Sequence, residues 1–406
     1  MLLRLGSMDT SRRAIVIGGG PAGLVAAIRL AEGGAATTLL EAASHFGGRA
    51  ASEQREGFFL NQGPHALYAG GPAMRELRAL GVELEWWNPT SPNSVFVRDG
   101  KPRRSPGGLV GMAPLLRQIY RRPPEELAGL SASEWLRQTL HSEKARAAAA
   151  ALVRVTTFVA DQETLSADVA ARQLKLGIAP GVRYLEGGWQ SLVNALAAKA
   201  EEAGVTLRTR AGARALHQEA GGWTVALDQE TLHADALVVA VGEPEDAEKL
   251  LAEKAPPAPG PAAELSVLDL GLRSLPKRTR RFALGIDAPT YLSRHSPPDH
   301  RGGALLSLAS YAREPRGALE ELADTVQPGW RERLIFDRFL PRMVPISAIA
   351  TPASGGLAGR PLADRGDGLY LAGDWIGPEG WLVDAAIASG SAAAAAALSR
   401  PVSVPA

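Results

Sequence analysis

The residues whose types and spacing most clearly predict chemistry are three glycines near the start of the chain. Gly18, Gly20 and Gly23 form the pattern Gly-x-Gly-x-x-Gly, which Pro21-Ala22 completes. Gly18 permits a tight turn from a strand into a helix, Gly20 lets a pyrophosphate approach the backbone, and Gly23 lets the helix pack closely on the strand. The N–H groups at the start of such a helix attract phosphate. The pattern therefore predicts a dinucleotide-binding corner.

An acidic residue stands where the ribose of such a dinucleotide is expected. The apolar run Ala14–Ile17 precedes the glycines, and a second run, Thr37–Leu40, ends on Glu41. Glu41 follows Gly18 at close to the spacing of about 20 residues that is typical of the carboxylate holding a ribose hydroxyl. We therefore expect a strand–helix–strand unit in which Glu41 binds the ribose.

The segment after Glu41 distinguishes between dinucleotides. Gly47, Gly48 and Arg49 lie just beyond the expected ribose acid. In these residues the chain resembles the flavin amine oxidase, phytoene desaturase and protoporphyrinogen oxidase superfamily, whose FAD-binding motif continues past the acid into Gly-Gly-Arg. The resemblance implies that the glycine pair lies against the flavin nucleotide and that Arg49 reaches its phosphates. Because an NAD enzyme needs no such extension, FAD is the expected cofactor, bound non-covalently.

A loop formed by Gly63, Pro64 and His65 follows an apolar run that starts at Phe58. In the superfamily the corresponding loop passes beside the isoalloxazine ring. An imidazole titrates near neutral pH and can donate to or accept from a flavin edge, so His65 is one of two candidate catalytic residues. A loop histidine bonded only to backbone is the alternative.

A second glycine-containing corner lies near the C-terminus. An apolar run ends in Gly373-Asp374, and a helix is expected from Glu379 to Gly390. The superfamily closes its FAD site in this way, which implies that Asp374 binds the pyrophosphate or the ribitol. The new helix would direct its N-terminus, with Leu382 and Val383, at the pyrimidine edge of the flavin. Reduced flavin carries negative charge there, and helix N-termini stabilise anions.

Three further positions carry weaker predictions from the same resemblance. Trp381 lies where amine oxidases of the superfamily place part of an aromatic cage, which makes it the second candidate catalytic residue; a core tryptophan is the alternative. Ala213 lies where the family holds the adenine with backbone, and Gly242 follows a strand that passes the cofactor.

The elements that must position these residues alternate between strands and helices, which predicts an α/β fold with an α+β substrate part. We expect a Rossmann-like, discontinuous FAD-binding domain of residues 1–85, 186–260 and 361–406. The second domain, of mixed sheet and helices, would bind substrate through residues 86–185 and 261–360. Within it, Ser131 and Glu134 have the spacing of a capping box at the start of a helix.

Composition excludes several other classes of function. The 406 residues include 44 Lys and Arg against 43 Asp and Glu, so nothing indicates a nucleic-acid partner. The absence of cysteine excludes disulfides, thiolate metal sites and a cysteinyl-linked flavin, and we expect no metal site. The short apolar patch at the N-terminus does not resemble a signal sequence or a membrane span, so a cytoplasmic location is expected.

One segment leaves a membrane contact open. Residues 107–122 combine apolar positions such as Leu115 and Ile119 with Arg117, Arg121 and Arg122. Such a segment can rest on a membrane surface or form a core helix with a solvated rim. We favour the core helix.

The expected reaction is removal of a hydride from a C–C or C–N bond of a mainly apolar small molecule, with oxygen or a quinone as electron acceptor. Gly63-Pro64-His65 and Gly373-Asp374 look more like the phytoene desaturase and protoporphyrinogen oxidase side of the superfamily than the amine oxidase side. A flavin amine oxidase, a redox-neutral flavin isomerase and a non-catalytic FAD-binding scaffold are the alternatives.

Overall fold

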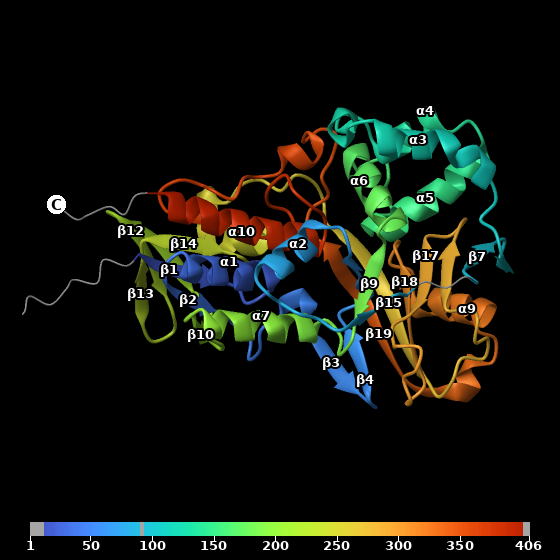
Figure 1. The fold of residues 1–406 in the computed structure, drawn as a ribbon, viewed down its shortest axis with the longest axis horizontal. Helices are drawn as coiled ribbons and strands as arrows, with labels where there is room; N and C mark the ends of the chain where they lie inside the picture. The colour runs from blue at the N-terminus through green and yellow to red at the C-terminus, as the bar shows by residue number, and fades with distance from the viewer. Residues whose placement is uncertain (1–11, 90–92, 401–406) are drawn as a thin grey trace, which may run out of the picture.

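A parallel sheet forms one half of the molecule (Figure 1), in the computed structural model that describes residues 12–89 and 93–400. Its five strands lie in the order β10-β2-β1-β14-β20, and its central strands are apolar runs buried on both faces, as expected for a parallel sheet covered by other elements. The strands are β1 (Arg13–Ile17), β2 (Ala36–Leu40), β10 (Thr206–Arg208), β14 (Ala236–Val239) and β20 (Leu369–Leu371). Three distant segments of the chain thus meet in one sheet.

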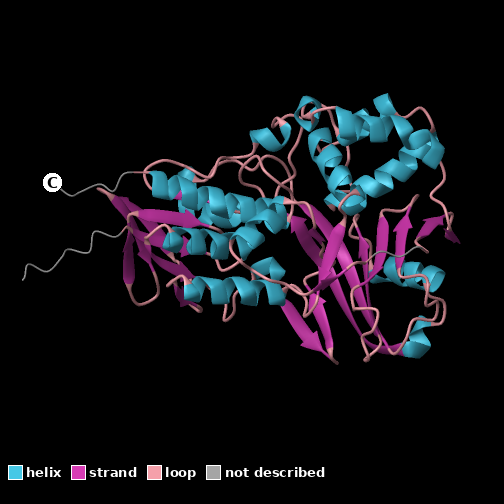
Figure 2. Cartoon of the chain, viewed as in Figure 1, coloured by secondary structure: helices cyan, strands magenta, loops and turns pink. Residues whose placement is uncertain are grey.

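Three helices lie together beside this sheet (Figure 2): α1 (Pro21–Glu32), α7 (Gln190–Glu202) and α10 (Val383–Ser399). Gly390 of α10 lies against the start of α1, since an added Cβ there would come within 2.3 Å of the Ala22 carbonyl oxygen. A small meander contacts the sheet through β1 and β14, and α8 (Pro244–Leu251) follows it. The meander strands are β11 (Ala215–Glu219), β12 (Gly222–Ala226) and β13 (Thr231–Ala234).

The other half is built on a seven-stranded mixed sheet in the order β19-β15-β18-β17-β16-β7-β8. Neighbouring strands are antiparallel except β7 and β16, which are parallel. Helix α9 (Arg316–Val326) packs on this sheet. The strands are β7 (Val95–Arg98), β8 (Lys101–Arg103), β15 (Ala263–Leu272), β16 (Phe282–Gly285), β17 (Thr290–Arg294), β18 (Ala304–Ser310) and β19 (Leu334–Ile346).

A cluster of helices lies beside this second sheet, at the upper right of Figure 1. The predicted capping box is confirmed: Ser131 Oγ accepts the Glu134 N–H at 3.1 Å, and Glu134 Oε2 accepts the Ser131 N–H at 2.9 Å. The helices are α3 (Ala113–Arg121), α4 (Ala132–Thr139), α5 (Glu143–Thr157) and α6 (Ala167–Ile178).

The segment considered for membrane contact contains α3, which is amphipathic. Leu115 and Ile119 are buried in the helical cluster, whereas Val110, Leu116 and Tyr120 are exposed. Among the described residues, no helix has both the length and the apolar character needed to cross a bilayer. Contact of this segment with a membrane surface stays a prediction.

Short elements lie between the longer ones. β3 and β4 form a hairpin, β5, β9 and β6 form a small sheet, and short 3-10 turns occur between longer elements. These elements are β3 (Ser52–Arg55), β4 (Phe58–Asn61), β5 (Leu67–Tyr68), β6 (Trp86–Trp87), β9 (Val182–Leu185), α2 (Pro72–Ala79), η1 (Gly48–Ala50), η2 (Leu109–Met112), η3 (Pro124–Leu127), η4 (Ala252–Lys254), η5 (Trp330–Arg333) and η6 (Gly356–Gly359).

The predicted start of the last helix is wrong. The expected helix from Glu379 begins instead at Val383, because Gly380 and Leu382 have φ angles of 78° and 57°, which a right-handed helix does not allow. It continues beyond the expected end at Gly390 to Ser399 through a run of alanines. The positive φ of Leu382 therefore determines where α10 begins.

Candidate cofactor and active site

A cleft of about 760 Å³ lies between the two halves, at the carboxyl ends of the parallel strands. Ligands of open α/β sheets bind at this edge. The cleft brings together most of the predicted site residues, namely Gly18, Gly20, Pro21, Ala22, Glu41, Gly47, Gly48, Arg49, Pro64, His65, Ala213, Gly242, Gly373, Asp374, Leu382 and Val383.

The first glycine corner has the geometry that phosphate binding requires. Gly18 has a φ of 109°, and a Cβ there would lie 2.4 Å from the Ala240 carbonyl oxygen, so only glycine fits. No side chain caps the N-terminus of α1 at Gly20. A Cβ on Gly20 would come no closer than 3.9 Å to other protein atoms, so this position opens into the cleft.

Gly23 does not line the cleft, because it lies under the corner. A Cβ there would be 1.9 Å from the Gly18 carbonyl oxygen, which is the close helix–strand approach expected from the motif. Gly63 is also absent from the lining. Its φ of 86° turns the loop, and an added Cβ would clash with Met343.

Glu41 is held by the backbone around the corner. Its Oε2 accepts the Gly19 N–H at 2.8 Å, and its Oε1 accepts the Ala43 N–H at 2.7 Å. A carboxylate has about four acceptor positions, so two remain for the hydroxyls of a ribose. Glu41 is therefore oriented before any ligand binds.

The Gly-Gly-Arg segment joins the two ends of the sequence. The Gly47 N–H donates to the Gly19 carbonyl oxygen at 2.8 Å, which fixes the segment beside the first corner. Arg49 Nη2 and Nη1 donate to Asp374 Oδ1 and Oδ2 at 2.6 and 3.3 Å. The Asp374 carboxylate also accepts the Ser347 N–H and hydroxyl, both at 2.9 Å.

The Asp374 carboxylate is therefore bonded by other residues of the protein, and the binding of pyrophosphate or ribitol by Asp374 stays a prediction. Its side chain is 3% exposed, and the bonds from Arg49 and Ser347 fill its acceptor positions. The arrangement fixes Arg49, whose side chain is 38% exposed beside the cleft. Ser347 belongs to no motif, and the sequence gives no signal for its role.

His65 also lines the cleft, close to Arg49. Its Nδ1 donates to the Gly63 carbonyl oxygen at 2.9 Å, and its ring packs on Trp189 at a centroid distance of 4.8 Å. Burial lowers the pKa of His65 to about 4, and the Arg49 guanidinium adds to the decrease, while hydrogen bonds to the backbone of Gly63 and Arg49 oppose it. The imidazole is therefore neutral at physiological pH.

Trp381 is not brought to the cleft. Its side chain is buried in the core of the helical cluster, and its indole N–H donates to the Thr157 carbonyl oxygen at 2.8 Å. The left-handed Leu382 intervenes between Trp381 and α10, so consecutive side chains take different directions. The alternative of a core tryptophan fits this geometry, and a ring over the flavin does not.

Large apolar residues that sequence reasoning missed complete the cleft. Phe158, Leu340 and Met343 line it together with Leu382 and Trp189. Phe158 and Leu382 both have left-handed φ angles, 61° and 57°, although neither is glycine. Strained positions of this kind cluster at ligand-binding sites, where the surrounding structure maintains them.

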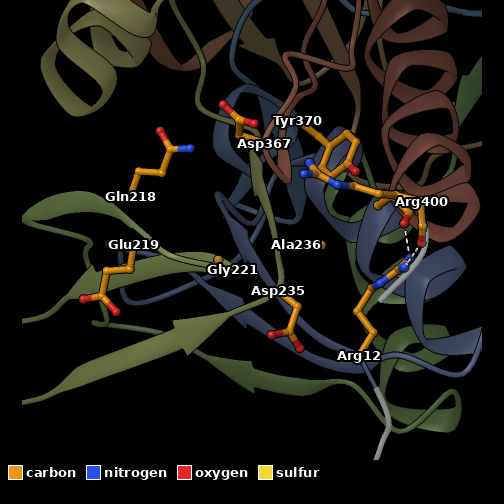
Figure 3. Close-up of a pocket in the computed structure, with 11 residues that line it drawn as sticks. Arg12, Gln218, Glu219, Gly221, Asp235, Ala236, Asp367, Tyr370 and Arg400 are labelled. Atoms are coloured by element: carbon orange, nitrogen blue, oxygen red, sulfur yellow. Dashed lines mark hydrogen bonds between the residues drawn. The ribbon is translucent and has the colours of Figure 1, made fainter. Parts of the chain in front are cut away.

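A smaller hollow of about 90 Å³ lies at the other end of the parallel strands (Figure 3). There the Arg12 guanidinium donates to the carbonyl oxygens of Ala397 and Arg400, at the end of α10. Because this hollow is at the amino ends of β1 and β14, it is not the edge at which such sheets bind nucleotides. In the described part of the chain, no group of three His, Asp or Glu residues has the geometry of a metal site.

The glycine corner, the oriented acid at the end of β2 and the second strand–helix corner at Gly373 are the features of a dinucleotide-binding α/β fold. A family model described as flavin containing amine oxidoreductase matches residues 21–272, more than half of the chain. The chain belongs to this family. The uncapped α1 terminus, the open Gly20 position and the free acceptor positions of Glu41 fit the FAD that the family implies.

Relatives fall on more than one branch of the superfamily. The chain is 34% identical over 97 residues to a coproporphyrinogen III oxidase from Propionibacterium freudenreichii (23% of this chain, 18% of that protein). It is 35% identical over 133 residues to an L-amino-acid oxidase from Pseudechis australis (32% of this chain, 25% of that protein). These matches span at most a quarter of the relatives' lengths.

The fold extends over almost the whole chain. A solved cyclohexylamine oxidase from Brevibacterium oxydans superposes with a TM-score of 0.69 at 18% identity, covering 96% of this chain and 99% of that one. At this identity the likeness shows the fold and not the substrate.

Proposed function

We propose that this enzyme removes a hydride from a C–C bond of a mainly apolar small molecule, as in a desaturase-type reaction. One observation carries the proposal. The half of the molecule that holds the seven-stranded sheet and the helical cluster contributes Phe158, Leu340 and Met343 to the lining of the cleft, and Leu382 adds a fourth large apolar side chain. The carboxylates among the described lining residues are Glu41, Glu243, Asp246 and Asp374, and all lie in segments of the Rossmann half.

That distribution of charge disfavours an ammonium substrate. A cation taken out of water requires a partner charge or a set of hydrogen bonds, whereas apolar surface is stabilised by about 25 cal/mol for each Å² that is buried. An amine oxidase is the second candidate. It is supported by the family to which the chain belongs and by the aromatic pair of His65 and Trp189 beside the cleft.

The proposed roles follow the geometry of the site. The backbone at Gly18 and Gly20 and the N-terminus of α1 would bind the diphosphate, while Glu41 would bind a ribose. Gly47 and Gly48 give the backbone close approach, and Arg49, fixed by Asp374, would supply positive charge to the phosphates.

The residues near the adenine and near the flavin ring are assigned in the same way. The backbone at Ala213 would border the adenine, and the N-terminus of α10 after Leu382 would face the pyrimidine edge of the flavin. Neutral His65 would orient the ring or the substrate by hydrogen bonding without adding charge. Bound FAD supplies the hydride-accepting chemistry. The apolar wall would exclude water, and oxygen or a quinone would reoxidise the enzyme.

We also propose that the FAD-binding domain comprises residues 1–85, 186–260 and 361–406, and the substrate-binding domain residues 86–185 and 261–360. The grouping of strands supports this division, because the five-stranded sheet draws on the first set and the seven-stranded sheet on the second.

The test is anaerobic bleaching of the purified flavoprotein by a panel of polyenes, porphyrinogens, amines and amino acids. We expect bleaching by a polyene or a porphyrinogen and none by simple amines. Bleaching by an amine alone would transfer the assignment to the amine oxidase candidate. If dithionite bleaches the flavin and no member of the panel does, a non-catalytic FAD-binding scaffold is favoured.

A further inference from the structure

A fully buried carboxylate, Asp384, lies in the first turn of α10. Its Oδ1 accepts the Ala73 N–H at 2.9 Å. Its Oδ2 is buried without a hydrogen-bond partner among the described residues. Since buried polar atoms are nearly always paired, an unpaired carboxylate oxygen at this position calls for an explanation.

The carboxylate serves as an N-cap for a different helix. Ala73 is the second residue of α2, and Gly71, at the N-cap position, provides no capping side chain. An N-cap oxygen accepts the N–H of the second or third residue of a helix. Asp384 belongs to α10, but its Oδ1 accepts the second N–H of α2 in this way. A Cβ on Gly71 would lie 2.2 Å from Asp384 Oδ2, so glycine is required for this approach. Asp384 thus fixes the first turns of α2 and α10 to each other.

That first turn of α10 borders the cofactor cleft. Leu382, Val383 and Ala386, on either side of Asp384 in the sequence, line the cleft. No side chain caps α10 itself, and although the Asp384 N–H donates to the Trp381 carbonyl oxygen, the partial positive charge of the helix N-terminus is not offset by a capping group. An ionised carboxylate in the same turn offsets part of that positive charge, and a protonated one does not.

We propose that Asp384 is a positioning residue that takes up a proton when the flavin is reduced, so that the N-terminus of α10 stabilises the negative charge of the reduced ring. The electrons come from the substrate hydride or from an added reductant, and the proton on Asp384 comes from solvent. The proposal rests on FAD as the cofactor and is independent of the substrate assigned above.

The charged groups around Asp384 leave it without a direct cation. Arg75 on α2 is paired with Glu379, which precedes α10, and the third titratable neighbour is the buried phenol Tyr68 of β5. Burial raises the pKa of Asp384 to about 7; the Ala73 N–H and Arg75 oppose the rise, and Glu379 adds to it. The group is therefore able to change its protonation in the physiological range.

The coupling has a definite sign. Charge on the reduced ring favours the protonated form of Asp384, and by linkage the protonated form favours reduction. As pH rises through about 7, ionisation of Asp384 makes the flavin harder to reduce. The flavin reduction potential should therefore fall more steeply with pH in this range than it does when Asp384 cannot ionise.

The test compares the flavin reduction potential of the wild-type holoenzyme with that of Asp384→Asn between about pH 5 and about pH 9, on either side of the raised pKa. Asparagine keeps an oxygen for the Ala73 N–H but carries no charge. We expect the two potentials to coincide at the acid end and the Asp384→Asn potential to become the more positive one at the alkaline end. Parallel curves across the whole range would overturn the proposal.

The control is Glu125→Gln, which removes one negative charge from an exposed residue paired with Arg172, away from the cleft. Its curve should overlay that of wild type. If Asp384→Asn does not fold, redox-difference infrared spectra of the wild-type holoenzyme give a second readout. A protonated-carboxyl C=O band that grows on reduction near pH 7 supports the proposal, and its absence contradicts it.

Discussion

Arg49 and Asp374, which are 325 positions apart in the sequence, form a two-bond ion pair beside the cofactor cleft, with 2.6 Å between Nη2 and Oδ1. The pair links the segment after the first glycine corner to the second corner, which follows strand β20. The N–H and hydroxyl of Ser347 donate to the remaining acceptor positions of the Asp374 carboxylate. We therefore propose that Asp374 acts on the cofactor through the position of Arg49.

Replacing Asp374 with Asn should weaken FAD binding about 10–100-fold, or about 1.4–2.8 kcal/mol, because Arg49 loses its charged partner. Arg49→Lys should weaken binding as well, since an ammonium cannot form two parallel bonds to a carboxylate. Fluorescence titration of the apoprotein with FAD measures both. The control is Arg13→Ala, which breaks a more exposed pair with Asp235 and should change the Kd little. Wild-type affinity in Asp374→Asn would show that the pair does not organise the site.

The apolar wall gives a prediction about substrate binding. Phe158→Ala removes a ring that is 8% exposed and lines the cleft, so KM for an apolar substrate should rise about 10–100-fold, the equivalent of about 1.5–3 kcal/mol of lost burial. FAD affinity should stay unchanged. Tyr120→Ala, on the exposed face of α3, is the control and should leave KM unaltered. An unchanged KM in Phe158→Ala would contradict the assignment of this wall to substrate.

The neutral state of His65 predicts how stability depends on pH. Because its folded-state pKa, about 4, is below the unfolded value, stability is complete above about pH 6.5 and falls as pH drops towards 4. The loss should be about 1–3 kcal/mol. His65→Gln should remove this part of the dependence. Urea unfolding of the two apoproteins over this range is the measurement, and identical slopes would contradict a neutral, partly buried ring in the folded state.

Asp384 predicts a dependence of the opposite sign. Its folded-state pKa, about 7, lies above the unfolded value, so its contribution to stability is present below about pH 4 and is lost as pH rises to 7. The loss is at most about 4 kcal/mol. Apo Asp384→Asn should show a flatter profile of unfolding free energy between these limits. A profile as steep as that of wild type would mean that a group other than Asp384 causes the pH dependence.

The parts of the site that could be predicted from sequence are those in which a few consecutive residues fix their own geometry. Gly18 must turn where only glycine fits, and Gly23 must be small because the helix lies against the strand. Glu41 could be predicted because the strand that follows a helix of typical length ends at a predictable distance from Gly18. Such constraints are local, so spacing alone identifies them.

The remaining parts depend on contacts between distant segments. Phe158 and Met343 reach the cleft only because the helical cluster and the seven-stranded sheet meet there, and neither belongs to a motif. The resemblance to amine oxidases favours Trp381 as a cage residue as readily as a core residue, and only the positive φ of Leu382, which separates Trp381 from α10, decides its direction. The partners of Asp374 and Asp384 come from segments that no local pattern connects with them.

The most direct test of a cofactor held at the first glycine corner is FAD binding by Gly20→Val. Because a Cβ at Gly20 meets no protein atom closer than 3.9 Å, the larger side chain should enter the cleft and leave the fold intact. Gly129→Val, also at an unobstructed glycine, is the matched control. We predict an apoprotein of wild-type thermal stability that binds FAD at least about 100-fold more weakly, a loss of about 2.7 kcal/mol or more. Stoichiometric FAD binding by Gly20→Val at wild-type affinity would contradict the account.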